Sequence, residues 1–343
     1  MVLATSTGGA TRSTSFSVIV VVSLILVVLV GSGCLIVATA NDEEDESTCE
    51  NDLDSTVGTS NPIVHPDDAK LLLYHFESTS STQDEARLVA EQYVKQNNDD
   101  DIHAFCVTAT EQTSGRGTSG RQWMGARGNT FVTIGIRQAT WMEDLKGIPL
   151  TLLPLKIGSL VANRVQELLD ECKASDDTGV APLVTVKWPN DVLVNEKKIS
   201  GVLIESSSNG WFLIGIGVNL AYAPVVPTSG PNHGRTSTCV QDYCSSPDWS
   251  KLVEDKARRM GVNLASDLNQ WIQKTSAAGS PNEASLSVLN DWKKWVDWDM
   301  ELVMRDTPNQ ERVRMIDLLP DGRIQVVGQD DGALRTLVSD YFL

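Results

Sequence analysis

Two charged segments, far apart in the sequence, carry the side chains that could do chemistry. One is the glycine-rich run Gly115–Trp123, GRGTSGRQW, which contains Arg116 and Arg121. The other begins with Lys187–Asp191, KWPND, and continues into Lys197–Gly201, KKISG. Glycine lets a backbone approach a ligand closely, and arginine and lysine bind phosphate and carboxylate groups. Together the two segments are typical of a site that holds a phosphate and a carboxylate at once.

Cysteine and histidine give no competing site. The six cysteines include no C-x-x-C pair and no Cys/His cluster, and the four histidines are scattered, so neither a zinc site nor a catalytic triad is indicated. Cys106 lies in an apolar run and is expected in the core. Cys239 and Cys244 could pair in an oxidising compartment. Catalysis is therefore expected to rest on lysine, arginine and carboxylate groups.

Alternating helix and strand patterns must position these residues from about Asn61 onward. An apolar run at Leu71–Phe76 predicts a strand, and Thr82–Glu85 predicts the capped start of a helix. β-rich runs at 105–110 and 130–136 flank the glycine-rich run, which therefore joins two strands. A helix is expected over 151–169, followed by an antiparallel meander of strands at 183–187, 191–195, 200–206 and 211–218.

The C-terminal third begins with a loop rich in proline and glycine beyond Leu220. Helices are expected over 249–274 and from 281 to about 295, followed by short strands at 301–305, 312–318, 323–327 and 333–338. The whole pattern predicts an α+β fold, in which helices pack on a mixed or antiparallel sheet and a small β-barrel closes the chain.

The net charge and the N-terminus limit the partners and the location. With 45 acidic against 28 basic residues and a net charge of −17, the chain has no broad nucleic-acid-binding face. Phe16–Ala40 has no charged residue and is long enough for a membrane span, while Ala38–Ala40, ATA, is typical of a signal-peptide cleavage site. We expect entry into the secretory pathway, with the segment either cleaved or kept as an anchor through residues 16–38. A buried core helix is less favoured because the segment has no polar face.

Five motifs in register resemble those of biotin–protein ligases, and the resemblance runs from about Leu71 to Val240. The C-terminal strands resemble that family's SH3-like domain. The motifs are Ser80–Gln83, Gln112 with Gly115–Trp123, Lys187–Asp191, Lys198–Gly201, and Gly215–Asn219. Several motifs in order are more specific than one glycine-rich loop.

The resemblance implies a class II synthetase-like sheet and a two-step reaction. Biotin and Mg-ATP, with Mg²⁺ as the metal, give biotinyl-5'-AMP and pyrophosphate. A lysine of the biotin carboxyl carrier domain of acetyl-CoA carboxylase, or of a related carboxylase, then attacks the mixed anhydride. No tightly bound cofactor is implied. The reaction needs fixed positive charge against two anions, and this agrees with the lysines and arginines above.

The resemblance also implies the residue roles. Lys198 would bridge the biotin carboxylate and the α-phosphate, Arg116 would lie over the biotinyl-adenylate, and Lys187 with Asp191 would complete the catalytic set. Asp191 would orient or deprotonate the carrier lysine. Biotin would be bound by Ser81, Thr82, Gln83, Gln112, Gly115, Arg116, Gly117, Thr118, Lys198 and Gly201. The nucleotide would be bound by Arg116, Arg121, Trp123, Asn190, Gly217 and Asn219.

Plainer readings remain open for several of these residues. Ser81 and Thr82 could simply cap a helix, and Lys187 could form a structural ion pair with Asp191. Lys198 could pair with Glu196 in an exposed turn, and Arg116 could be a solvated turn residue. Trp123 and Trp188 are expected as packing or pocket-wall residues.

Two departures from the family stand out. Thr118 occupies a position where bacterial members often carry a second arginine, so retention of the adenylate is expected to be weaker. Nothing before Leu71 resembles the helix-turn-helix domain of the repressor-type ligases, so no DNA binding is expected.

Three functions follow in order of preference: a biotin–protein ligase, a lipoyl or octanoyl protein ligase, and a non-catalytic module that binds biotin. The expected domains are a signal peptide or anchor at 1–40, an acidic flexible linker at 41–66, a catalytic domain at 67–295 and the SH3-like domain at 296–343. The leader favours a plastid reached through the endoplasmic reticulum or a membrane-anchored form, with the cytoplasm as the alternative.

Overall fold

The computed structural model describes residues 63–66, 68–96, 104–172, 181–227, 234–304 and 311–338. The expected leader and nearly all of the expected linker, including residues 16–38, lie outside these ranges. None of the helices within the described ranges has the length and apolar content that a membrane span requires.

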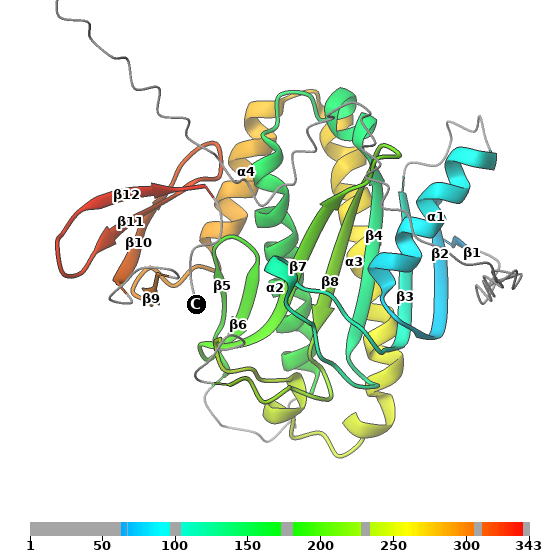
Figure 1. The fold of residues 1–343 in the computed structure, drawn as a ribbon, viewed down its shortest axis with the longest axis horizontal. Helices are drawn as coiled ribbons and strands as arrows, with labels where there is room; N and C mark the ends of the chain where they lie inside the picture. Colours follow the sequence, from blue (N-terminus) through cyan, green and yellow to red (C-terminus); the bar gives the residue numbers. More distant parts are fainter. Residues whose placement is uncertain are drawn as a thin grey trace, which may run out of the picture.

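An eight-stranded mixed sheet forms the centre of the molecule (Figure 1). Its strand order is β1-β2-β3-β4-β8-β7-β6-β5, in which only β2 and β3 run parallel. The strands are β1 (Ile63–His65), β2 (Asp68–Thr79), β3 (Ala104–Gln112), β4 (Thr130–Arg137), β5 (Val184–Lys187), β6 (Asp191–Val194), β7 (Lys197–Ser206) and β8 (Trp211–Val218). The predicted meander is the antiparallel half, β5 to β8, and the predicted α+β class with a mixed sheet is confirmed.

Helices cover both faces of this sheet because its strands alternate apolar side chains toward each face. On β3, Phe105 and Val107 belong to the core under α1 (Thr82–Gln96), whereas Cys106 belongs to the larger core. That larger core also contains α2 (Leu153–Glu171), α3 (Trp249–Ala278) and α4 (Pro281–Lys293). Cys106 is fully buried, as expected of a small core residue.

A four-stranded antiparallel sheet lies at one end of the molecule, beyond β5, where a small barrel was expected (Figure 1). Its order is β12-β11-β10-β9, from β9 (Glu301–Val303), β10 (Arg312–Leu318), β11 (Ile324–Gly328) and β12 (Leu334–Leu337). Met315 and Leu318 of β10 extend the main core. The Trp188 indole donates a hydrogen bond to Gly322 O at 2.9 Å, which ties the turn before β6 to this sheet.

Two further details concern the start of the described chain and the cysteines. Ile63–His65 falls in the range expected to be linker, yet it pairs with β2 as an edge strand. Cys239 and Cys244 are not bonded to each other, and the four cysteines in the described ranges are free. The Cys239 N–H donates to Asp242 Oδ2 at 3.1 Å at the start of the short helix Val240–Tyr243, whereas Cys244 Sγ donates to Cys172 O at 3.3 Å.

Candidate active site

A cavity of about 350 Å³ lies where the start of α1, the glycine-rich run, β7 and β8 meet residues of 224–227 and 234–237. Most of the residues selected from the sequence line it, although they come from four separate parts of the chain. They are Ser81, Thr82, Gln83, Gln112, Arg116, Gly117, Thr118, Arg121, Trp123, Asn190, Asp191, Lys198, Gly201, Gly217 and Asn219. Gly115 and Lys187 do not line the cavity, but each contacts a residue that does, Trp123 and Asp191 respectively.

Neutral hydrogen-bonding groups gather at the end of the cavity nearest α1. The Thr82 N–H and hydroxyl both donate to Gln112 Oε1, at 2.8 and 3.1 Å. Thr133 Oγ1 lies 3.0 Å from Thr82 Oγ1 and 3.1 Å from Gln83 Oε1. Ser81 Oγ accepts a hydrogen bond from the Gln83 N–H at 3.2 Å, so the expected capping contact is present. The threonine, serine and glutamine groups of this end donate and accept hydrogen bonds without adding charge.

A carboxylate surrounded by cations forms the other end. The Lys198 ammonium lies 2.6 Å from Asp191, and the Lys187 ammonium lies 3.6 Å from it. Lys187 faces Asp191 across the β5–β6 hairpin, so the three residues between them in KWPND form the turn that brings the two side chains together. Burial raises the pKa of Asp191, but the Lys198 and Lys187 charges outweigh burial and hold that pKa well below its usual range.

Two arginines add to this cationic end. Arg121 donates to Thr118 Oγ1 at 2.8 Å, and its charge also lowers the pKa of Asp191. Arg235, which the sequence analysis did not select, lines the cavity, and burial lowers the pKa of its guanidinium. Its Nη1 donates to Glu196 O at 3.1 Å, while its buried Nε has no hydrogen-bond partner among the described residues. Arg235 therefore supplies a positive charge to the pocket that Thr118 also lines, where bacterial members of the family often have an arginine in place of Thr118.

The Trp123 indole forms a flat wall over two facing glycines. Gly201 of β7 lies opposite Gly217 of β8, and a methyl group on Gly217 would come within 2.3 Å of the ring. The Lys198 ammonium lies 5.9 Å from the ring centroid, and the buried Trp123 Nε1 has no partner among the described residues. At Gly217 close approach requires glycine, whereas a methyl group on Gly201 would make tight contacts of 3.2 Å with Lys198 and Trp123.

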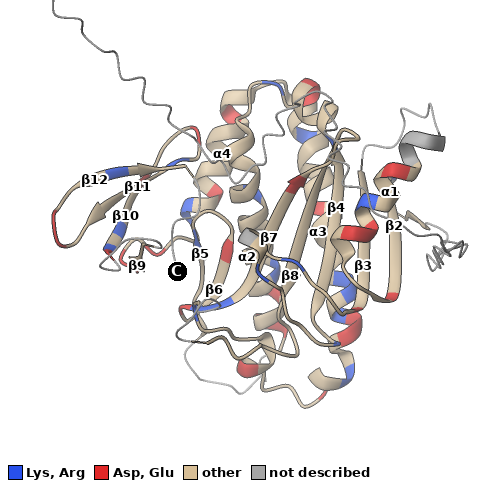
Figure 2. Cartoon of the chain, viewed as in Figure 1, with Lys and Arg blue, Asp and Glu red and all other residues tan. Residues whose placement is uncertain are grey.

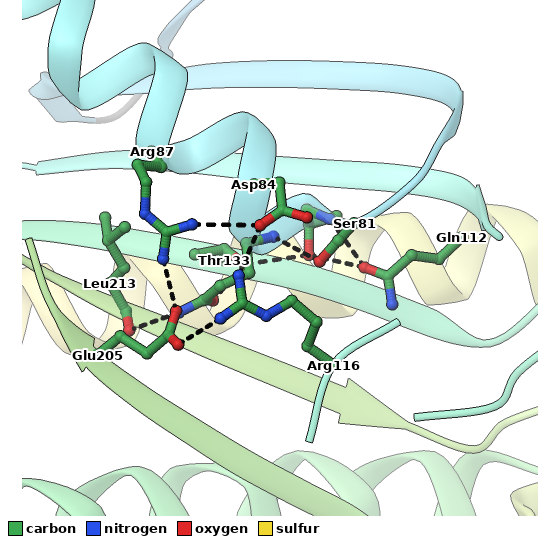
Figure 3. A network of polar contacts seen from close by, with 10 residues as sticks. Ser81, Asp84, Arg87, Gln112, Arg116, Thr133, Glu205 and Leu213 are labelled. Carbon is green, nitrogen blue, oxygen red and sulfur yellow. Dashed lines mark hydrogen bonds and ion pairs between the residues drawn. The ribbon is translucent and has the colours of Figure 1, made fainter. Parts of the chain in front are cut away.

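The glycine-rich run folds back on itself as a short hairpin-like loop. Gly115 O accepts a hydrogen bond from the Trp123 N–H at 2.9 Å, and the Gly117 N–H donates to Arg121 O at 2.8 Å. Arg116 extends from this loop to two carboxylates, Asp84 and Glu205, each at 2.6 Å (Figure 3). Its guanidinium is therefore engaged at the α1 end of the cavity.

The remaining selected side chains mainly hold the cavity walls. Asn190 Nδ2 donates to Val202 O at 2.6 Å, and Asn219 Nδ2 donates to Thr238 O at 3.1 Å. Trp188 is buried against Gly322 and is not a lining residue. Of the polar residues that the sequence analysis missed, Thr133 gave a weak signal as a threonine inside the apolar run of β4, and Arg235 gave none.

Comparison with known proteins agrees with this geometry. The profile of the biotin/lipoate A/B protein ligase family matches residues 75–220, the stretch that contains most of the cavity. A biotin–[acetyl-CoA-carboxylase] ligase of Paracoccus denitrificans is 38% identical over 191 residues, which is 51% of this chain and 72% of that protein. Biotin–protein ligase 2 of Arabidopsis thaliana is 27% identical over 202 residues, 56% of each protein.

The fold is also found among solved structures. A biotin protein ligase from Aquifex aeolicus, solved with biotin and ATP, superposes with a TM-score of 0.53 at 20% identity, covering 79% of this chain and 97% of that one. At this identity the likeness concerns the fold alone. The similarity to the Paracoccus ligase, over nearly three quarters of that protein's length, places this chain in the biotin–protein ligase family.

Proposed function

We propose that this protein activates biotin with ATP to form biotinyl-5'-AMP, and then transfers biotin to a lysine of a carboxylase carrier domain. The observation that carries the proposal is one cavity with a neutral hydrogen-bonding end and a cationic end. Biotin is a neutral ureido ring joined by an aliphatic chain to a carboxylate, and the cavity offers a complement to each end. The acetyl-CoA carboxylase ligases among the relatives support a carboxylase as the acceptor.

Lys198 is the central residue of the first step. The biotin carboxylate must approach an anionic α-phosphate, and negative charge builds up on the phosphoryl oxygens in the transition state. The Lys198 ammonium lines the cavity and is held by Asp191, so it is positioned between the two reacting groups before they arrive. Arg121 and Arg235 then supply further positive charge for the polyphosphate, and the Trp123 ring offers a surface on which the adenine can stack.

Asp191 acts as an orienting group more than as a proton acceptor. Its pKa is held far below neutrality, so it is a weak base toward a lysine ammonium, whose pKa is about 10.4. An ionised carboxylate at this place can still hold the Lys198 ammonium and accept a hydrogen bond from the incoming carrier amine. The second step then relies on proximity and on the reactive anhydride.

Mg²⁺ enters, in this proposal, with the phosphates of ATP. Among the described residues no group of three or more His, Cys, Asp or Glu side chains could hold a metal ion. The carboxylate of the cationic end, Asp191, is already engaged by two lysines. These residues do not fit a protein-held metal, and no step is assigned to one.

The test is direct detection of the acyl-adenylate. The purified chain is incubated with Mg-ATP and either biotin or lipoate, and the product is identified by mass spectrometry. We expect biotinyl-adenylate from the wild type and about a hundredfold to a thousandfold less from Lys198→Ala, because a preorganised charge at the transition state is lost. The neighbouring Lys197→Ala is the matched control and should be normal, since Lys197 is exposed and is not a lining residue.

The alternatives predict different products. A lipoyl or octanoyl ligase would give lipoyl-adenylate and little biotinyl-adenylate. A non-catalytic biotin-binding module would give neither product while still binding biotin. The intact set of Lys198, Asp191 and Arg121 around one cavity supports turnover.

A further inference from the structure

Glu205, near the end of β7, is a charged residue that neither the sequence motifs nor the proposed chemistry uses. Its side chain is only 12% exposed, yet it carries a carboxylate and lies beside the α1 end of the cavity. A charge this deeply placed needs partners, and Glu205 has three of them from two different parts of the chain (Figure 3).

One carboxylate oxygen fastens the glycine-rich run. Glu205 Oε1 lies 2.6 Å from Arg116 Nη2, and Asp84 Oδ1 lies 2.6 Å from Arg116 Nη1. The guanidinium therefore bridges α1 and β7, and the loop that carries it is attached to both. Because both carboxylates already neutralise it, Arg116 is better suited to hold the loop than to bind a phosphate.

The other carboxylate oxygen fixes Gln83. Glu205 Oε2 accepts a hydrogen bond from Gln83 Nε2 at 3.1 Å, and Leu213 O accepts a second one from the same nitrogen at 3.1 Å. With both amide hydrogens engaged, Gln83 presents its carbonyl oxygen to Thr133 and the cavity. An acceptor there suits a ligand with an N–H donor, such as a ureido ring.

We propose that Glu205 is a positioning residue that couples the orientation of the Gln83 amide to the anchoring of the glycine-rich run through Arg116. This inference rests on the proposed biotin chemistry for its ligand. It assigns to one carboxylate two tasks that would otherwise be independent: it selects an acceptor at the ureido end, and it holds in place the loop that covers the cavity.

Glu205→Gln is the informative variant because it keeps the size and polarity of the side chain and removes its charge. We expect the KM for biotin in adenylate formation to rise about tenfold, because a charge-assisted hydrogen bond that fixes the Gln83 amide is lost. The kcat at saturating biotin and ATP should stay within about twofold, since Lys198 and Asp191 are not touched. Any rise in the KM for ATP should match that of Asp84→Asn, which loosens the same loop. A general loss of folding would move all three values.

The loop is followed separately by limited trypsin cleavage after Arg121, which needs no catalysis. Glu205→Gln, Asp84→Asn and Arg116→Gln should each speed this cleavage by about fivefold, and the Arg116→Gln/Glu205→Gln double variant should be no faster than Arg116→Gln alone.

Asp84→Asn should leave the KM for biotin near normal, since Asp84 contacts Arg116 and Arg87 and makes no hydrogen bond to Gln83 among the contacts described. The control is Glu77→Gln, which removes an exposed ion pair with Arg127 whose residues do not line the cavity.

The outcomes separate the two ideas. If the wild type makes biotinyl-adenylate but Glu205→Gln matches it in both KM for biotin and cleavage rate, the positioning role is wrong and the proposed function stands. If the wild type makes no biotinyl-adenylate, the proposed function fails, whereas the cleavage rates still decide whether Glu205 holds the loop. If Glu205→Gln does not fold, the Arg116→Gln variant, in which Glu205 is unchanged, tests the loop anchor alone. A wild-type rate of cleavage after Arg121 in that variant would overturn the anchoring role.

Discussion

At the scale of single residues, the site depends on one carboxylate kept ionised among cations. Asp191 is buried, and burial alone would raise its pKa, but Lys198 and Lys187 lower it to about 2. A carboxylate whose pKa is depressed on folding stabilises the folded state at pH values above its unfolded pKa of about 3.9. That contribution is lost as the pH falls through the folded value.

Asp191→Asn should therefore destabilise the protein in a pH-dependent way. At pH 7 we expect a loss on the order of 3 kcal/mol, because two lysines would be left near a neutral amide in a buried place. The difference between wild type and variant should shrink as the pH falls from about 4 toward 2, which urea unfolding of both proteins at several pH values measures. A difference that is constant from pH 7 to pH 3 would contradict the assigned ionisation.

The residues of the site were predictable only where they belong to a local motif. KWPND, KKISG and the glycine-rich run supplied Asp191, Lys198 and Arg121, which line one cavity, and Lys187, which lies beside Asp191. Glu205 and Arg235 were missed because their partners lie far away along the chain, as in the Gln83–Glu205 contact across 122 residues. The carboxylate partners of Arg116 could not be predicted from the loop sequence. They are Asp84 of α1 and Glu205 of β7, which only the tertiary structure brings together.

At the scale of elements, the β7–β8 pair lies under the Trp123 ring at the cationic end of the cavity. Its facing glycines, Gly201 and Gly217, leave room for the Trp123 ring, and the ring in turn lies beside the Lys198 ammonium. Close packing of this kind tolerates an added methyl group poorly.

Gly217→Ala should displace the Trp123 indole, because the new methyl group would lie 2.3 Å from its ring. We expect the KM for ATP in adenylate formation to rise about tenfold, with a much smaller change in the KM for biotin, whose ureido end lies elsewhere. Gly158→Ala in α2 is the matched control, since a methyl group there meets nothing within 4 Å. An equal rise in the KM for ATP and the KM for biotin would contradict the placement of Trp123 at the ATP end of the cavity alone.

Most elements were predictable because their patterns are local and strong. The helix expected over 249–274 ends a few residues later, at Gly279, whose φ of 64° favours glycine and stops the helix. The strand β1 was missed because three residues are too short for an alternation pattern, and only its pairing with β2 defines it. The C-terminal strands were found from their Asp-Gly turns, but their attachment through Trp188 and Gly322 required the tertiary structure.

At the scale of the whole molecule, the charge is strongly negative while the site is cationic. Acidic and basic residues are spread along the helices and both sheets (Figure 2). With a net charge of −17, the protein repels anions at long range, so the binding of ATP should depend on the local group of Lys187, Lys198, Arg121 and Arg235. The global charge thus favours solubility, and the local charge supplies the chemistry.

The N-terminal segment makes a separate prediction about where this chemistry takes place. Phe16–Ala40 is uncharged and followed by an acidic stretch, so we expect a fluorescent fusion of residues 1–70 to enter the endoplasmic reticulum, whether the segment is cleaved or kept. Microscopy and the size of the fusion on a gel distinguish the two forms. An Ile25→Arg fusion is the matched control and should be diffuse, because a central arginine opposes membrane insertion.

If the unchanged fusion is itself diffuse, the leader does not direct the protein to the endoplasmic reticulum, and the cytoplasmic alternative gains support. If it reaches the endoplasmic reticulum, the ligase must meet its carrier domain in a compartment supplied through that route, such as a plastid.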